Sequence, residues 1–113
     1  MIRNIVLFKL NEGLTRVSPA VTEGFELLKN LDRDIPEIRQ WEVGWHVFDE
    51  TPASYDFAVN SLFDDTAAFQ RYFNHPAHLA AIAHWMHHAS WVVVDMHIQS
   101  TRTSGTSGGA GIG

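Results

Sequence analysis

The chain has 113 residues, of which 45% are hydrophobic and 19% charged, and its formal net charge is −5. It has no cysteine, which excludes disulfides, thiol catalysis and Cys-ligated metal sites. Its basic residues are few and scattered, which argues against binding of nucleic acid or anionic lipid. No apolar run reaches the roughly 20 residues of a membrane span. We expect a cytoplasmic globular protein with one domain over residues 1–99, followed by a flexible Gly/Ser/Thr-rich tail over residues 100–113, which has too little apolar surface to offset its ordering entropy.

The first half of the domain reads as a strand, a helix and a second strand. Residues 2–10 alternate between two sides, with Asn4 among apolar neighbours on one of them, which predicts a β-strand. Ser18 and Pro19 form an N-cap pattern, and apolar residues at helical spacing extend the predicted helix to about residue 32. Residues 40–47 alternate again and predict the second strand.

The second half repeats the pattern. Turn-forming residues at 49–54 lead into a third alternating segment at 55–63, so the second and third strands are expected to form a hairpin. Asp64 or Asp65 caps the next helix, and a short helix starts at Pro76. The residues of this short helix that we expect to face the core are Leu79, Ile82, Ala83 and Met86. Residues 91–98 are apolar almost throughout, which predicts a last strand buried on both faces.

The resulting order, β-α-β-β-α-β, is the ferredoxin-like arrangement of the α+β class, a four-stranded antiparallel sheet with its helices on one face. Both sides of the first and last strands carry apolar residues. The face without helices would therefore be an apolar patch larger than a monomer usually exposes. We expect a homodimer in which two sheets pack face to face as a dimeric α+β barrel; the alternative is a monomer with an apolar sheet.

Six segments of the sequence together resemble a known family. They are residues 3–9, Ile35-Pro36, Gly44, residues 63–65, the tetrapeptide His75-Pro76-Ala77-His78, and residues 93–95. The chain resembles the stress-responsive dimeric α+β-barrel family, called Dabb, over residues 2–97. The resemblance implies a dimer with a central barrel, helices outside it, and a cavity between each sheet and its helices. Within the family, the chain is similar to polyketide cyclases of the olivetolic acid cyclase type, which carry out a cofactor-free aldol closure.

His78 and Tyr72 are the candidate catalytic residues. His78 lies in the first turn of its helix, where the positive end of the helix dipole favours the neutral imidazole that a general base needs. Tyr72 ends the preceding helix, so the chain break directs both side chains toward one space, where a phenol can orient the imidazole or donate to a developing oxyanion. The resemblance implies the same pair. The alternative is a purely structural role, in which Tyr72 is a core aromatic residue and His78 is bonded to a loop carbonyl.

Asn4, His75, Phe57 and Trp41 are the candidate substrate-binding residues. Asn4 is polar on an apolar side and needs a partner, either a buried backbone group or a ligand in the cavity. His75 precedes Pro76 and serves as a helix cap or a site residue. The family usually has His where this chain has Asn4, and another pocket His of the cyclases falls near Phe57. Asn4 with His78 or Trp41 is loosely similar in kind to the residues of cofactor-free oxygenases and haem-degrading enzymes in the wider superfamily.

The leading hypothesis is a small-molecule enzyme that acts by acid/base chemistry on a hydrophobic, carbonyl-containing, polyketide-like substrate, as a cyclase or lyase without metal or organic cofactor. The alternatives are a non-catalytic stress-responsive or ligand-binding dimer and a cofactor-free monooxygenase. Three histidines of the short helix stand on one side of it and could hold Zn²⁺, but the expected inward residues place them on a solvated polar face. They are His84, His87 and His88.

Overall fold

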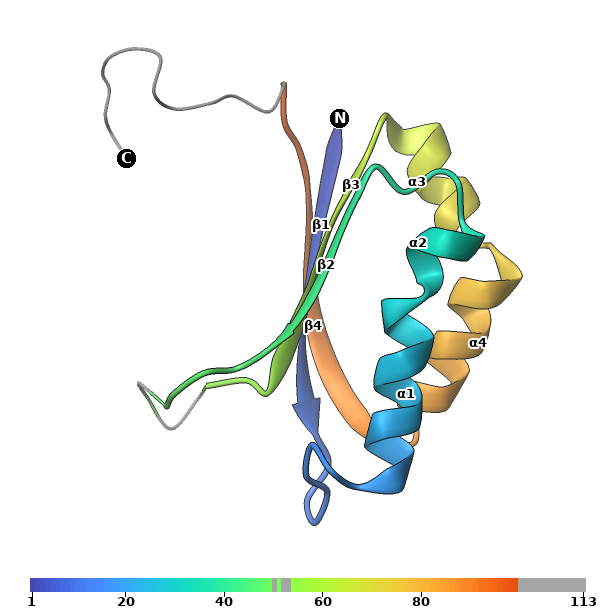
Figure 1. Cartoon of the computed structure of the whole chain (residues 1–113). Helices are drawn as coiled ribbons and strands as arrows, with labels where there is room; N and C mark the ends of the chain where they lie inside the picture. The colour runs from blue at the N-terminus through green and yellow to red at the C-terminus, as the bar shows by residue number, and fades with distance from the viewer. Residues whose placement is uncertain (50, 52–53, 100–113) are drawn as a thin grey trace.

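The computed structural model describes residues 1–49, 51 and 54–99; the predicted tail at 100–113 lies outside the described residues. The chain forms two layers, a β-sheet and a set of helices that all lie against one of its faces (Figure 1). The elements in chain order are β1 (Ile2–Leu10), α1 (Pro19–Lys29), α2 (Leu31–Asp34), β2 (Gln40–Trp45), β3 (Phe57–Phe63), α3 (Thr66–Phe73), α4 (Pro76–Trp85) and β4 (Ala89–His97).

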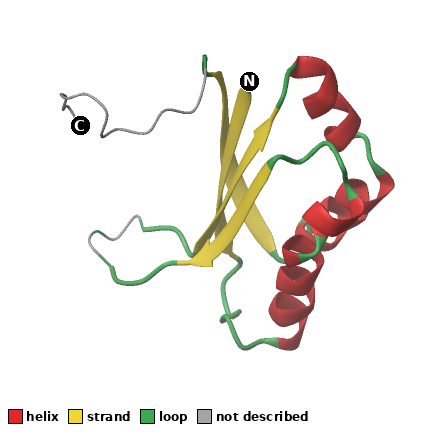
Figure 2. Ribbon diagram, turned by 45° about the horizontal axis from the view of Figure 1, so that its top comes forward, coloured by secondary structure: helices red, strands yellow, loops and turns green. Residues whose placement is uncertain are grey.

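The sheet has the strand order β2-β3-β1-β4, and every neighbouring pair is antiparallel. Two central strands, β1 and β3, are thus flanked by β2 and β4. Figure 2 shows the sheet and its helical layer from a second direction. This confirms the predicted ferredoxin-like fold and the predicted hairpin of β2 and β3. In the described part of the chain, no helix has both the length and the apolarity that crossing a membrane requires.

Local signals set the helix boundaries. The Asp65 carboxylate accepts a hydrogen bond from the Ala68 amide at 2.8 Å, so Asp65 is the residue that caps α3. Ser18 stands at the N-cap of α1, but its hydroxyl accepts from the Thr15 amide at 2.9 Å instead of from the helix. The predicted first helix ends earlier than expected, at Lys29, and a single short turn of helix, α2, follows it.

The core lies between the two layers and is largely aromatic. Phe8 of β1 and Phe57 of β3 stack in parallel with ring centroids 4.4 Å apart. The indole of Trp85 packs on both rings, at 5.6 Å from Phe8 and 5.1 Å from Phe57. Its N–H donates to the Gly24 carbonyl of α1 at 3.1 Å, so one fully buried side chain joins α4 to α1 and to the sheet.

The predicted inward face of α4 is wrong. His78, Ala81 and Trp85 are the buried residues of this helix, whereas Leu79 is 49% exposed and Met86 66% exposed. The segment is apolar on nearly every side, so its periodicity does not select one face. Tertiary packing determines which face of α4 is buried, because Trp85 carries the largest side chain and the core between α1 and the sheet accommodates it.

The predicted two-sided burial of the last strand is also wrong for this single chain. β4 pairs only with β1 and is an edge strand, and its valines Val92, Val93 and Val94 remain about half exposed. The face of the sheet without helices carries further exposed apolar side chains, namely Leu7 of β1 and Met96 of β4. An apolar strand indicates that both faces need cover, but the chain supplies a second layer on one face only.

Candidate functional site

A cavity of about 140 Å³ lies between the sheet and the helices. Its walls are mostly aliphatic and aromatic. Four polar side chains enter it, two from the sheet and two from the helices: Asn4 of β1, Asp95 of β4, Tyr72 of α3 and His78 of α4. A small apolar space with a few convergent polar groups is the usual form of a ligand or active site.

Tyr72 and His78 are adjacent in this cavity, as predicted from the chain break between their helices. The helix α3 ends one residue after Tyr72, and α4 begins two residues before His78. The turn between them is closed by the His75 amide, which donates to the Tyr72 carbonyl at 3.1 Å. The phenol and imidazole ring centroids are 4.4 Å apart, and both side chains are buried.

The His78 imidazole is held in one tautomer. Its Nδ1 lies 2.9 Å from the Phe73 carbonyl oxygen, which can only accept, so Nδ1 carries the proton and Nε2 is the basic nitrogen. Burial lowers the pKa of His78 from its ordinary value of 6.5, against a smaller raising effect of the Phe73 bond, and the nearby His75 lowers it further. The imidazole is therefore neutral at pH 7, as a general base must be.

The reactive atoms of this pair face open space. Neither Nε2 of His78 nor the Tyr72 hydroxyl has a hydrogen-bond partner among the described residues. In the same part of the chain no fully enclosed side-chain nitrogen or oxygen lacks a partner, so both atoms must be reachable from the cavity. Burial first, and the Asp95 charge second, raise the pKa of Tyr72. The phenol thus keeps its proton and can act as a hydrogen-bond donor.

Asn4 belongs to a polar chain on the sheet side of the cavity. It lies opposite Asp95 in the register of β1 and β4 and opposite Ser61 in that of β1 and β3. Its amide nitrogen donates to the Asp95 carboxylate, and its side-chain oxygen accepts from the Ser61 hydroxyl at 3.5 Å. Asn4 therefore lines the cavity and is also satisfied by protein groups. Asp95 was missed in the sequence, where its signal is a single carboxylate within an otherwise apolar strand.

Trp41 also lines the cavity, with its ring 6.1 Å from that of Tyr72 and its indole N–H donating to the Leu28 carbonyl at 2.9 Å. The other two predicted contact residues do not line it. The Nδ1 of His75 accepts from the Ala77 amide at 3.0 Å, so His75 is the cap of α4. Phe57 is in the aromatic core. We remove His75 and Phe57 from the candidate site, because one is engaged as a cap and the other in packing.

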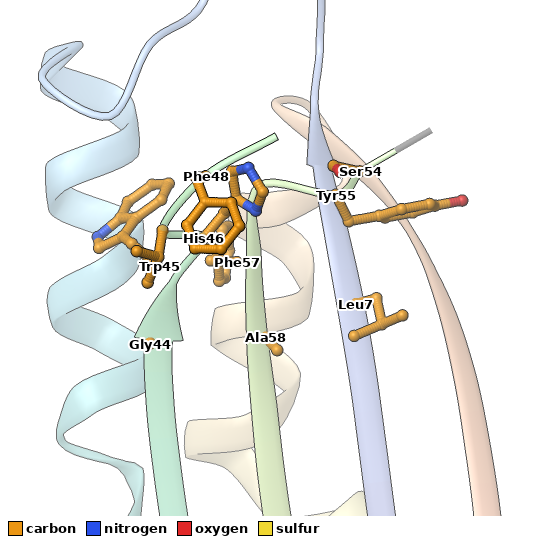
Figure 3. Close-up of a pocket in the computed structure, with 10 residues that line it drawn as sticks. Leu7, Gly44, Trp45, His46, Phe48, Ser54, Tyr55, Phe57 and Ala58 are labelled. Atoms are coloured by element: carbon orange, nitrogen blue, oxygen red, sulfur yellow. The ribbon is translucent and has the colours of Figure 1, made fainter. Parts of the chain in front are cut away.

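Phe57 instead borders a separate, open pocket at the hairpin end of β2 and β3 (Figure 3). Its volume is about 500 Å³ and its lining is mainly apolar, including Leu7 and Phe48. Nε2 of His46, which also lines this pocket, lies 2.7 Å from the Asp49 carboxylate. Its wide opening makes this pocket a surface hollow, whereas the cavity between the layers brings several polar side chains together in an apolar space.

The three histidines at the end of α4 do not form a common face. His84 is half-buried and lies 2.7 Å from the Ala20 carbonyl oxygen, so it helps to fix α4 on α1. Its ring is 4.8 Å from that of His88, and His87 is exposed. Among the residues that the structure describes, no three His, Asp or Glu side chains converge as a metal site would require.

The sequence model of the Stress responsive A/B Barrel Domain, Dabb, matches residues 2–98. The chain belongs to this family. An uncharacterized protein of Streptomyces coelicolor is 47% identical over 95 residues, which cover 84% of this chain and 97% of that protein. A dimeric ferredoxin-like protein of unknown function from Thermobifida fusca is 31% identical with a TM-score of 0.74, covering 86% of this chain and 90% of that one.

One solved structure with the same fold is an enzyme, the hydroxynitrile lyase from Passiflora edulis. It is 23% identical to this Dabb protein, with a TM-score of 0.75, and the match covers 90% of this chain and 96% of the lyase. At this identity the likeness establishes a common fold and no more. The matches confirm the family that the opening strand and the His75–His78 tetrapeptide indicated.

Proposed function

We propose that this Dabb protein is a small-molecule enzyme of the lyase or cyclase type, which uses acid/base chemistry without a cofactor on a carbonyl compound. The observation that carries the proposal is that two polar atoms without hydrogen-bond partners among the described residues lie side by side in an apolar cavity. These atoms are Nε2 of His78, the basic nitrogen of a neutral imidazole, and the hydroxyl of Tyr72, which retains its proton.

In the proposed reaction, Nε2 of His78 takes a proton from the carbon next to a substrate carbonyl. The Tyr72 hydroxyl donates a hydrogen bond to the carbonyl oxygen as negative charge develops on it. In the cyclase direction, the enolate carbon then attacks a second carbonyl of the substrate, and the imidazolium gives its proton to the alkoxide that forms. In the lyase direction the same steps run in reverse: Nε2 takes the proton of the hydroxyl, the carbon–carbon bond breaks, and the imidazolium returns the proton to the carbon that is released. The apolar walls favour this sequence because charge–dipole interactions are stronger where water is excluded.

The size of the cavity limits the part of the substrate that reacts there. About 140 Å³ is close to the space that holds one benzene molecule in an engineered protein cavity, roughly 150 Å³. An open groove of about 490 Å³ adjoins it, and the two share Phe69, Phe73 and Asp95 as walls. A polyketide-like substrate would place its reacting carbonyl in the cavity and its remaining chain in this groove.

We also propose that the protein works as a homodimer joined through the sheet face without helices. Exposed apolar side chains of β1 and β4 gather there: Leu7, Val92, Val94 and Met96. Burying them against a second copy would remove a patch that a monomer rarely exposes. Solved relatives from Bacteroides fragilis and Thermobifida fusca are described as dimeric and ferredoxin-like.

A second candidate function is ligand binding without catalysis. The supporting observation is the mainly aliphatic and aromatic lining of the cavity, which can hold a small apolar ligand whether or not a reaction follows. The oxygenase alternative gains no such support, because the Asn4 amide is already engaged by Asp95 and Ser61.

Proton abstraction can be tested without knowing the natural substrate. Acetophenone, a ring-sized ketone, is incubated with the protein in D₂O, and exchange at its methyl group is followed by NMR. We expect exchange above the buffer rate in the wild type. His78→Gln should reduce the enzymatic part by about 10²-fold or more, and Tyr72→Phe should reduce it less. The matched control is His87→Gln, which changes an exposed histidine of the same segment.

If a folded His78→Gln variant exchanged the methyl protons of acetophenone at the wild-type rate, His78 would be removed from the mechanism. Saturable binding of acetophenone with no exchange in any variant would favour the ligand-binding candidate. Poly-β-keto thioesters, tested next on the same variants, would then show whether a longer substrate is turned over.

A further inference from the structure

We infer that Asp95 is a second ligand-contacting group of the cavity, and that it favours neutral ligands with a hydroxyl group over carboxylates. The inference rests on the proposed function only in placing the ligand in this cavity. It adds the chemical class that the cavity accepts.

The position of Asp95 is fixed by the sheet. It stands opposite Asn4 in the register of β1 and β4, and it lines the cavity together with residues of α3 and α4. Its side chain lines both the cavity and the adjoining groove. A ligand that extends from one into the other therefore passes this carboxylate, whereas Tyr72 and His78 meet the ligand from the helix side.

The hydrogen bonds of Asp95 leave part of it available. The Asn4 amide donates to Oδ1 of the carboxylate. This orientation of the amide is set by chemistry, since a carboxylate accepts only and the Asn4 oxygen is turned to the Ser61 hydroxyl, 3.5 Å away. Oδ2 of Asp95 receives no hydrogen bond from any residue that the structure describes. It can accept one from a ligand hydroxyl.

No lysine or arginine among the described residues lines the cavity or the groove, so no permanent positive charge faces this carboxylate there. The histidines that line them are His78, which is buried and neutral at pH 7, and His97, which is exposed at the end of β4. Asp95 is itself exposed where the cavity meets the groove. A ligand carboxylate would meet a like charge there beside apolar walls, which is unfavourable even with partial screening by solvent. A neutral ligand meets two acceptors, Nε2 of His78 and Oδ2 of Asp95, and one donor, the Tyr72 hydroxyl. A compound with both a hydroxyl and a carbonyl matches this set.

Three ring-sized probes separate these properties: phenol has a donor, toluene has none, and benzoate is an anion. Binding is followed through the indole N–H signals in NMR titrations. Trp41, Trp85 and Trp91 line the cavity and Trp45 does not, so Trp45 is an internal control for the location of binding. For the wild type at pH 7.5 we expect phenol to bind roughly fivefold more tightly than toluene, since one net hydrogen bond is worth about that factor. We expect benzoate to bind at least tenfold more weakly than phenol.

The variant Asp95→Asn keeps the size of the side chain and an acceptor for Asn4 while removing the charge. It should reduce the phenol preference and strengthen benzoate binding several-fold. Asp32→Asn is the matched control, because it removes an exposed carboxylate of α2 away from the cavity, and it should change neither ratio.

Two results would overturn the inference. One is wild-type protein that binds benzoate as tightly as phenol at the cavity tryptophans, and this result needs no variant to fold. The other is a folded Asp95→Asn variant with unchanged ratios. Both are binding measurements, so they leave the exchange experiment on His78 unaffected. Conversely, loss of the His78 role would not alter the selectivity expected from Asp95.

Discussion

Replacing Gly24 with alanine tests whether α1 and α4 are packed as closely as the structure shows. A β-carbon at Gly24 would lie 2.6 Å from Cζ2 of Trp85, 2.7 Å from its Cε2 and 2.7 Å from Cδ2 of His84. Ordinary contacts of this kind are 3.4–4 Å, so the helices or the indole must move by about 1 Å. Trp85 is fully buried against Phe8 and Phe57 and has little room to do so.

The expected magnitude follows from three effects on the free energy of unfolding. Overpacking a core costs about 1–3 kcal/mol. Displacing the indole also weakens its hydrogen bond to the Gly24 carbonyl, at 3.1 Å, which is worth about 1 kcal/mol. The better helix propensity of alanine offsets about 1 kcal/mol. Gly24→Ala should therefore lower stability by about 1–3 kcal/mol, with each kcal/mol shifting Tm by roughly 4–8 °C in a domain of this size.

The assay is urea unfolding followed by tryptophan fluorescence, at one fixed protein concentration because a dimer would make the midpoint concentration-dependent. A double-mutant cycle with Trp85→Phe isolates the contact, since phenylalanine lacks the outer part of the indole. The cost of Gly24→Ala should be smaller in the Trp85→Phe background. A Gly24→Ala protein as stable as the wild type, or an equal cost in both backgrounds, would refute this packing.

Two further outcomes follow from the site. Burial lowers the pKa of His78 in the folded protein below 6.5, the ordinary value. Below about pH 6.5 the unfolded chain therefore binds a proton more readily than the folded protein. The free energy of unfolding falls as the pH drops from there through the lowered pKa of the folded state. Urea unfolding of His78→Gln between pH 7.5 and 5 should show a weaker fall, and identical slopes would contradict the assignment. Phe73 is 52% exposed and separates the cavity from the groove, so Phe73→Ala should cost only about 1 kcal/mol and speed phenol exchange in NMR line shapes. An unchanged exchange rate would mean that Phe73 does not control entry.

Much of the candidate site could be predicted from local sequence because its two main residues are close in the chain. Tyr72 and His78 are six positions apart on either side of a helix break, so the geometry of that turn alone brings their rings together, 4.4 Å apart. Asp95 could not be found in this way. It meets Asn4 only through the pairing of the first and last strands, and neither segment contains a signal for that register by itself.

Phe57 and His75 show the converse limit. Each belongs to a pattern that is compatible with a site, but a side chain contacts a ligand only if packing and capping leave it free. Phe57 is taken into the stack with Phe8, and His75 accepts the Ala77 amide.

The sequence by itself determined the order of the strands and main helices and the family, and it narrowed the cap of α3 to Asp64 or Asp65, because alternation, capping and short motifs act over a few residues. Only the tertiary structure decided which side of α4 is buried, which strand forms the sheet edge, and which polar groups meet in the cavity. These outcomes depend on side-chain volumes and strand register across the whole domain. A nearly all-apolar helix or strand is compatible with several packings until a residue such as Trp85 occupies the available space.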